Sequence, residues 1–341
     1  MSNLMRTATS LALALVTGAA ARTDDGTAVN VANFALAESD LYMGRTVAQN
    51  GLGVLGHQRA VTSVDNQPII RMNRDTLYSS GVFDLDAGPV TITLPDNPDD
   101  RFQSMQIVTE DHFTPDVAYE GSHSCDRDGI GTRYMQVIVR TFINPDNPAD
   151  LDAAHRLQDG ITVEQAASGA WEIPAWDQAS QDKVRGALLT LGAQGGLEGR
   201  VKMGPRGEVD PVAQLIATAQ GWGLNPSHAA IYVMGLPKAN DGQTVHRLTM
   251  KDVPVDAFWS ISVYNADGYF RKNDLNAYSL NSVTATKDGD GAAVIQFGGC
   301  DGAVVNCLPI VQGWNYALRL CRPRQEIIDG SWQPPVAAPV E

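Results

Sequence analysis

The chain has 341 residues and carries 25 Lys and Arg against 39 Asp and Glu, a formal net charge of −14. This length is enough for about two domains, and an apolar fraction of 43% with 19% charged residues excludes an intrinsically disordered chain. The acidic balance argues against a nucleic-acid partner, which needs a basic face, and against charge-driven docking on anionic lipid. We therefore expect an acidic, turn-rich globular protein.

The N-terminal segment has the features of a secretory signal peptide. Arg6 precedes an apolar run at residues 11–16, and small residues end the segment at Ala21. The apolar run is too short to span a bilayer, which takes about 20 residues. We expect residues 1–21 to be a signal peptide and the protein to be exported, either to the periplasm or out of the cell. The alternative is an ordinary N-terminal helix of a cytoplasmic protein.

Helical and strand patterns alternate along the rest of the chain. Apolar residues at helical spacing predict helices over residues 30–49 and 181–191, and Asn-Pro and Asp-Pro openings predict helices from Asn147 and from Asp210. Short apolar runs between turn residues predict strands. These lie at residues 90–94, 101–108, 133–142, 245–250, 258–264, 292–297 and 316–321.

These patterns predict a mainly β protein with inserted helices, an α+β fold of two β domains. After the leader we expect an N-terminal helical segment at 22–56 and an antiparallel β-barrel or sandwich at 57–145. A helical connection at 146–240 and a jelly-roll-like β-sandwich at 241–341 complete the predicted organisation.

Three segments carry a resemblance to a known family. They are Asn73-Arg-Asp-Thr-Leu-Tyr78, Gly88-Pro-Val-Thr-Ile-Thr-Leu-Pro-Asp96 and Phe258-Trp-Ser-Ile-Ser-Val-Tyr264. Through them the chain resembles bacterial proteins that join the domain of unknown function 1254 to the domain of unknown function 1214. The resemblance implies β-barrel and jelly-roll-like domains in that order, but it brings no settled reaction.

The densest polar run of the sequence lies within the first of these segments and just before it. Two guanidiniums beside a carboxylate and a phenol can hold a carboxylate or phosphate, with the phenol as proton donor. The same residues also suit an internal ion-pair and turn network, because Asn-Arg-Asp is good turn chemistry. The candidates are Asp75 and Tyr78 for catalysis, and Arg71, Asn73 and Arg74 for substrate binding.

A second polar cluster, Glu110-Asp-His112, follows the strand predicted at 101–108. Glu110 and His112 would project together, which suits a catalytic base, His112, held by a carboxylate. The same pair could supply two metal ligands, with His57 or His123 as a third. A solvated loop is the alternative.

Metal and cofactor motifs are weak in this sequence. Asp-rich turns at 96–100, 126–129 and 288–291 offer oxygen ligands, but none matches the EF-hand loop, so surface turns are the simpler interpretation. We predict no cofactor and leave calcium or another divalent metal open.

The four cysteines suit disulfides in an exported protein, and no Cys-x-x-Cys pair suggests zinc. Cys300 and Cys307 flank a short loop that can close locally, which would leave Cys125 to pair with Cys321. Four buried thiols in a cytoplasmic protein are the alternative.

Two functions remain open from the sequence. The first is a cofactor-independent hydrolase or lyase that acts on a small anionic organic or carbohydrate-like substrate. The second is a secreted ligand-binding or envelope-assembly module whose polar cluster is purely structural. In both cases the expected partner is a small, anionic ligand, with no nucleic acid and no stable membrane span, and a homo-oligomer stays open.

Overall fold

The computed structural model of the protein describes residues 26–67, 70–197 and 199–340. The predicted signal peptide, residues 1–21, lies outside the described residues. Within the described part, every helix is too short or too polar to cross a membrane.

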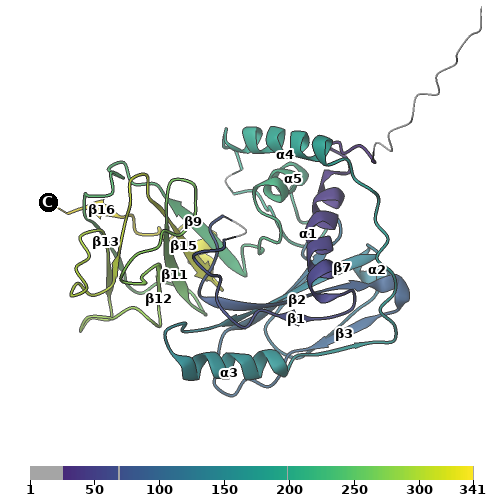
Figure 1. Cartoon of the computed structure of the whole chain (residues 1–341), viewed down its shortest axis with the longest axis horizontal. Coiled ribbons are helices and arrows are strands. Elements are labelled where there is room, and N and C mark those ends of the chain that lie inside the picture. The colour runs from purple at the N-terminus through teal and green to yellow at the C-terminus, as the bar shows by residue number, and fades with distance from the viewer. Residues whose placement is uncertain (1–25, 68–69, 198, 341) are drawn as a thin grey trace, which may run out of the picture.

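The N-terminal unit is built on two antiparallel sheets that pack face to face (Figure 1). Apolar side chains from both sheets, among them Phe83, Val137 and Ile92, are fully buried between them. The larger sheet has the order β1 (Gly56–His57), β2 (Thr76–Asp84), β7 (Tyr134–Phe142), β4 (Gln103–Thr109) and β5 (Val117–Ala118). In the smaller sheet, β3 (Val90–Thr93) lies between β6 (Ser122–Cys125) and β8 (Thr162–Gln165).

Helices lie on both sides of the N-terminal sheets. Figure 1 shows α1 (Phe34–Asn50), α4 (Gln178–Gly192) and α5 (Pro211–Gln220) together on one side of the larger sheet and α3 (Pro148–Asp159) on the opposite side. The predicted caps are present, since Asn147 accepts a hydrogen bond from the Ala149 amide and Asp210 accepts from Val212 and Ala213. Short helical turns occur at η1 (Leu85–Ala87), α2 (Arg127–Ile130) and α6 (Gln325–Ile328).

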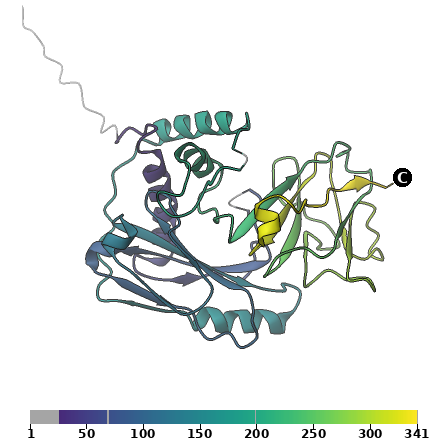
Figure 2. The same ribbon diagram turned by 180° about the vertical axis from the view of Figure 1, so that it is seen from behind.

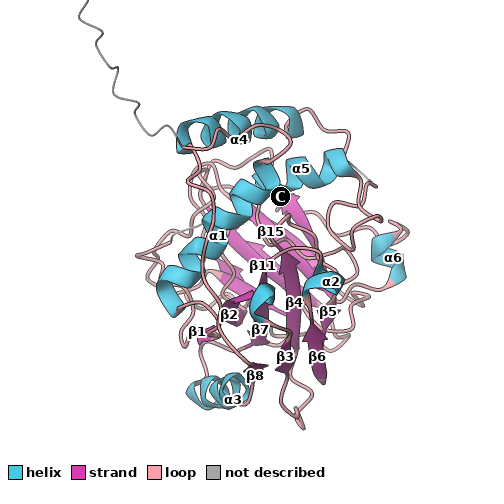
Figure 3. Ribbon diagram, turned by 90° about the vertical axis from the view of Figure 1, so that its right-hand side faces the viewer, coloured by secondary structure: helices cyan, strands magenta, loops and turns pink. Residues whose placement is uncertain are grey.

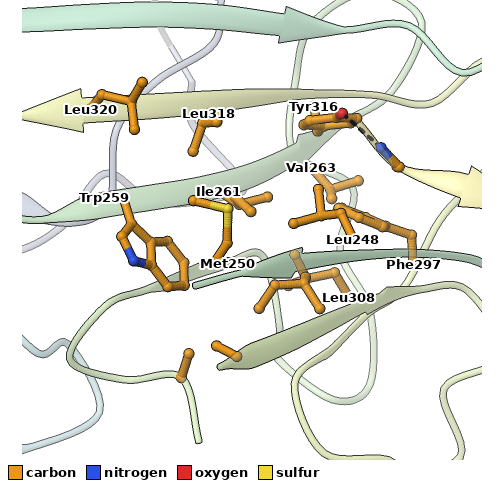
Figure 4. Close-up of a cluster of buried hydrophobic side chains, with 14 of the residues drawn as sticks. Leu248, Met250, Trp259, Ile261, Val263, Phe297, Leu308, Tyr316, Leu318 and Leu320 are labelled. Carbon is orange, nitrogen blue, oxygen red and sulfur yellow. Dashed lines mark hydrogen bonds between the residues drawn. The ribbon is translucent and has the colours of Figure 1, made fainter. Parts of the chain in front are cut away.

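The C-terminal unit is a sandwich of two four-stranded sheets. One has the order β14 (Cys307–Leu308), β13 (Ala293–Phe297), β10 (His246–Met250) and β16 (Ala338–Pro339); the other has β12 (Ser279–Asn281), β11 (Trp259–Tyr264), β15 (Asn315–Cys321) and β9 (Ala230–Gly235). Alternate residues of these strands meet in the core that Figure 4 shows, where Ile261, Leu318 and Phe297 are fully buried or nearly so. In the same core the Tyr316 hydroxyl accepts a hydrogen bond from the Ala337 amide at 3.2 Å.

The predicted fold class is confirmed as mainly β, α+β and sandwich-like, while the described sheets form no closed barrel. Two strands lie where the sequence predicts a helical connection. β8 pairs with β3 in the N-terminal unit, and β9 pairs along its whole length with β15. The C-terminal sandwich therefore begins at Ala230, before the predicted boundary at 241. From behind, β9 and α6 lie on the side of the sandwich that borders the N-terminal unit (Figure 2).

One of the two disulfide pairings is confirmed and the other is wrong. Cys300 and Cys307 form a disulfide. Cys125 and Cys321 are free thiols. Cys125 ends β6 against the core of the N-terminal unit, whereas Cys321 ends β15 of the C-terminal sandwich on the same face of the strand as Arg319, so the two thiols belong to different units. Burial raises the pKa of the Cys125 thiol to about 11 and that of Cys321 to about 12.

Candidate functional site

One face of a C-terminal sheet is polar and meets the N-terminal unit. Along β11, the residues Trp259, Ile261 and Val263 point into the sandwich core. Because side chains alternate along a strand, the residues between them, with those of β15 and β12 beside them, point the other way. This outward set includes Ser260, Ser262, Tyr264, Asn281 and Arg319.

Arg319 joins the two units. Its side chain is buried, and it donates to Ser262 Oγ at 2.9 Å and to the Tyr264 hydroxyl at 2.7 Å within its own sheet. It also donates to the backbone carbonyl of Arg71 at 2.8 Å and to that of Met72 at 3.3 Å. The Tyr264 hydroxyl adds a bond of 2.8 Å to the same Met72 carbonyl. The segment before β2 is therefore held by a buried guanidinium of the other unit.

Asp75 is buried at this junction, not open to solvent. Its Oδ1 accepts a hydrogen bond of 3.0 Å from Asn281 Nδ2, and Oδ2 has no hydrogen-bond partner within the described structure. Burial raises the pKa of the Asp75 carboxyl, and the charge of Arg319 opposes that rise. The structure thus places this candidate base between the two units, with its oxygens facing protein.

The other residues predicted in this run also make contacts that support the junction. Asn73 Oδ1 accepts from the Asp75 amide at 2.6 Å, and its Nδ2 donates to Thr76 Oγ1 at 2.9 Å. Arg74 donates to the Thr62 carbonyl at 2.6 Å and lies over the Tyr278 ring of the C-terminal unit, 5.2 Å from its centre. Arg71, at φ 53°, donates its backbone amide to the Gly268 carbonyl at 2.7 Å.

A different arginine, which sequence reasoning missed, stands beside Tyr78. Arg140 on β7 lies directly opposite Tyr78 on β2, and its guanidinium carbon is 5.6 Å from the centre of the Tyr78 ring. It donates to Gln106 Oε1 at 2.9 Å, to Asn225 Oδ1 at 3.2 Å and to the Gly223 carbonyl at 3.3 Å. All three acceptors are neutral, and no carboxylate of the described residues forms an ion pair with Arg140.

Phenols from both units lie near this guanidinium. Tyr232 on β9 accepts a hydrogen bond of 2.8 Å from Asn225 Nδ2, and the Arg140 charge acts on Tyr232 and on Tyr119. Tyr232 is 42% exposed, and desolvation by the surrounding protein raises the pKa of its hydroxyl. We call Tyr78, Tyr119, Arg140, Asn225 and Tyr232 the junction cluster.

His112, the predicted base, is fully buried elsewhere in the N-terminal unit. Its Nδ1 lies 2.7 Å from Thr218 Oγ1, and its Nε2 accepts a hydrogen bond of 2.8 Å from the Gly223 amide. Because Thr218 Oγ1 donates to the Gln214 carbonyl, Nδ1 carries the proton and both ring nitrogens are used. Burial lowers the pKa of His112 to about 3. These contacts position the chain at Gly223, next to Arg140, and leave no ring nitrogen free for a substrate.

Glu110 does not face His112 but meets Asp40 of α1. Trp176 Nε1 donates to Asp40 Oδ2 at 2.7 Å, while Asp40 Oδ1 has no hydrogen-bond partner within the described structure. Burial and the nearby Asp40 raise the pKa of Glu110 to about 7. The Tyr134 amide donates to Glu110 Oε2 at 3.3 Å, so Glu110 connects α1 to the end of β4 and to β7. Across the described residues, no three His, Cys, Asp or Glu side chains are arranged to hold a metal ion.

The comparisons with known proteins divide the chain at the same junction. Residues 52–130 match the family model "Protein of unknown function (DUF1254)", and residues 235–325 match "Protein of unknown function (DUF1214)". The chain belongs to the family that joins these two domains. Of the junction cluster, Tyr78 and Tyr119 lie within the DUF1254 match, whereas Arg140, Asn225 and Tyr232 lie between the two matches.

Two solved structures share the fold of this DUF1254–DUF1214 protein. The VPA0106 protein from Vibrio parahaemolyticus is 16% identical, with a TM-score of 0.72 over 91% of this chain and 98% of that one. An uncharacterized protein from Burkholderia cenocepacia is 13% identical, with a TM-score of 0.50 over 91% and 88% of the two chains. Among curated proteins none matches significantly. At these identities the likeness concerns the fold alone.

Proposed function

We propose that this protein binds a small organic anion with a planar or sugar ring at the junction cluster. The observation that carries the proposal is the Arg140 guanidinium, which is half-buried, held by three neutral acceptors and without a carboxylate partner among the described residues. Such a charge is stabilised by an anionic ligand, because a guanidinium binds a carboxylate or phosphate through two parallel hydrogen bonds.

The tyrosines supply the rest of the recognition. The half-exposed ring of Tyr232 offers an apolar face for a ring, while the rings of Tyr78 and Tyr119 lie under the guanidiniums of Arg140 and Arg322. The hydroxyls of the three tyrosines can bond to polar substituents. Few polar groups on a largely aromatic wall are typical of small-molecule sites. The cluster takes residues from both units, so a bound ligand would also join them.

In this proposal the run at residues 71–75 has a structural role. Asp75 and the backbone at Arg71 and Met72 are bonded to Asn281 and Arg319 of the other unit, and the run ends where β2 presents Tyr78. The contacts therefore support the interpretation of these residues as a structural network that places Tyr78 beside Arg140.

A cofactor-independent hydrolase or lyase at the same cluster is the second candidate. It is favoured by the Tyr78 phenol, because its ring lies against the Arg140 guanidinium that would hold the anionic group. The Tyr78 hydroxyl accepts a hydrogen bond of 3.5 Å from Asn73 Nδ2. A phenol in that position would donate a proton to a leaving group. Asp75 and His112 would act only by holding the shape of the site.

Calorimetric titration with ring-bearing anions tests the binding proposal. Benzoate and glucuronate serve as anionic probes, and benzamide and glucose serve as their neutral counterparts. We expect binding of at least one anion, no binding of its neutral counterpart, and a loss of about tenfold or more in Arg140→Gln. Arg156→Gln, an exposed arginine on α3, is the matched control. Equal affinity in Arg140→Gln and wild type would refute the proposal.

Turnover separates the two candidate functions. Any anion that binds is incubated with wild type and with Tyr78→Phe, and products are followed by mass spectrometry. An enzyme gives a product that Tyr78→Phe forms at least about a hundredfold more slowly, the contribution expected of a general acid. A binding protein returns the anion unchanged with both variants.

We also propose that the protein is exported. The disulfide between Cys300 and Cys307 supports this, because disulfides persist in oxidising compartments and are rare in the cytosol. Cell fractionation tests it: export predicts a periplasmic or extracellular product shortened at its N-terminus, and a full-length cytoplasmic product would contradict it.

A further inference from the structure

A pocket lies on the outer face of the other C-terminal sheet, away from the junction. Leu248, Ile295 and Phe297 of β10 and β13 point into the sandwich core, so Arg247, Val294 and Gln296 point outward. These three line a cavity of about 270 Å³. The junction face belongs to the sheet with β11 and β15, which Figure 3 shows. The pocket belongs to the other sheet of the sandwich and lies on the opposite side of it.

Two loops form the walls of this cavity. One brings Thr286, Lys287 and Asp288 from the segment before β13. The other is the disulfide loop, residues 300–307, which contributes Val304, Val305 and Asn306. The cavity thus has a floor made by strands and a wall closed by the disulfide.

Asn306 fixes the two walls to each other and to the floor. Its Nδ2 donates to the Thr286 carbonyl at 2.7 Å and to the Val294 carbonyl at 3.2 Å, and its Oδ1 accepts the Thr286 amide at 2.9 Å. Asn306 has φ 53°, a left-handed conformation that asparagine tolerates better than most residues. The pocket shape is therefore set by hydrogen bonds as well as by the disulfide.

The chemistry of the lining is cationic on one side and aliphatic on the other. Arg247 Nε donates to Gln296 Oε1 at 2.9 Å, and its Nη1 and Nη2 have no acceptor among the described residues. Asp288 also lines the cavity but forms no ion pair with Arg247 among the described residues, and its Oδ1 accepts hydrogen bonds from the amides of Asp290 and Ala292. Val294 is 41% exposed and Val305 is 60% exposed.

We propose that this cavity, named here the disulfide-loop pocket, binds a short-chain aliphatic carboxylate. The carboxylate bonds to the two free nitrogens of Arg247 in the bidentate geometry that guanidinium favours. The aliphatic chain covers the exposed methyl groups of Val294, Val304 and Val305, which removes apolar surface from water. The volume lies near the low end of the range of ligand pockets, about 300 Å³ upward, which suits a small ligand.

Methyl NMR of the valine-labelled full chain tests the proposal with hexanoate as the probe. We expect saturable shifts of the Val294, Val304 and Val305 methyls, and at least about tenfold weaker binding of hexan-1-ol, which keeps the chain but lacks the charge. Shifts that spread over valines elsewhere, or equal binding of hexan-1-ol, would overturn it.

Variants locate the interaction. Arg247→Gln weakens hexanoate binding by about tenfold or more, while Lys251→Gln, an exposed cation just after β10, leaves it within about twofold. The double variant Cys300→Ser and Cys307→Ser keeps the fold of the sandwich, read from its other methyl signals, but weakens binding. Unchanged affinity in Arg247→Gln or in the double serine variant would contradict the assigned site. The methyl shifts of Val294, Val304 and Val305 report on this pocket and not on the junction cluster, so failure here and failure at the junction are distinguishable.

Discussion

Replacement of Arg319 by Met tests whether the buried polar face holds the two units together. The guanidinium makes four hydrogen bonds, two of them to the backbone of the other unit. Met fills similar space but donates nothing. The Met72 carbonyl keeps its bond from Tyr264, whereas the Arg71 carbonyl loses its bond from Arg319 in a buried place.

The expected loss follows from those contacts. Hydrogen bonds from a charged donor contribute about 1.5–3 kcal/mol each, and an orphaned buried carbonyl costs about 1–3 kcal/mol. Part of the lost free energy of unfolding is offset, because the variant no longer has to desolvate a charged side chain on folding. We therefore expect Arg319→Met to lower the free energy of unfolding by about 3–5 kcal/mol.

Urea unfolding followed by tryptophan fluorescence measures this change, with Arg324→Met as the matched control. Arg324 forms an exposed ion pair with Asp256, so its replacement leaves the unfolding midpoint unchanged. A loss in Arg319→Met of less than about 1 kcal/mol, which is within the range of ordinary surface substitutions, would refute the reasoning.

Three further outcomes follow from the structure. Because the folded state raises the pKa of Asp75, we expect Asp75→Asn to lower the free energy of unfolding by less than about 1 kcal/mol at pH 8. As pH falls, the free energy of unfolding of wild type rises relative to that of the variant. A loss as large as that of Arg319→Met contradicts this. Glu110, with a pKa raised to about 7, stabilises wild type below the unfolded pKa and loses that stabilisation as pH rises through about 7. Glu110→Gln should flatten this slope between pH 5 and 7, about 1.4 kcal/mol per pH unit for one proton, and urea midpoints that keep the slope refute it. Opening the Cys300–Cys307 disulfide with dithiothreitol should lower Tm while leaving the fluorescence of the folded state unchanged; an unchanged Tm would show that the loop does not contribute to stability.

Local signals in the sequence predict most of the secondary structure. The Asn-Pro and Asp-Pro openings place α3 and α5, and apolar runs between turns place β4, β7, β10, β11, β13 and β15 to within a residue or two. β9 is missed because its outward residues, Tyr232 and Met234, are exposed apolar side chains, which removes the polar half of the expected alternation.

The sequence also marks the junction without revealing how it is built. It singles out residues 71–78, but the residues that bond to this run, Asn281 and Arg319, come more than 200 positions later and lie on strands. Pairing at such separation is set by the docking of two folded units, which no local pattern encodes. Arg140 did leave a signal, since it is the one charged residue within the sequence of its strand, Tyr134–Phe142.

Titration of Arg140→Gln with the anion that binds wild type most tightly tests the central claim most directly. The claim is that an uncompensated guanidinium between the two domains is the anchor of a small anionic ligand. It predicts binding weakened about tenfold or more, with an unfolding midpoint close to that of wild type. Undiminished affinity in a folded Arg140→Gln variant would contradict it.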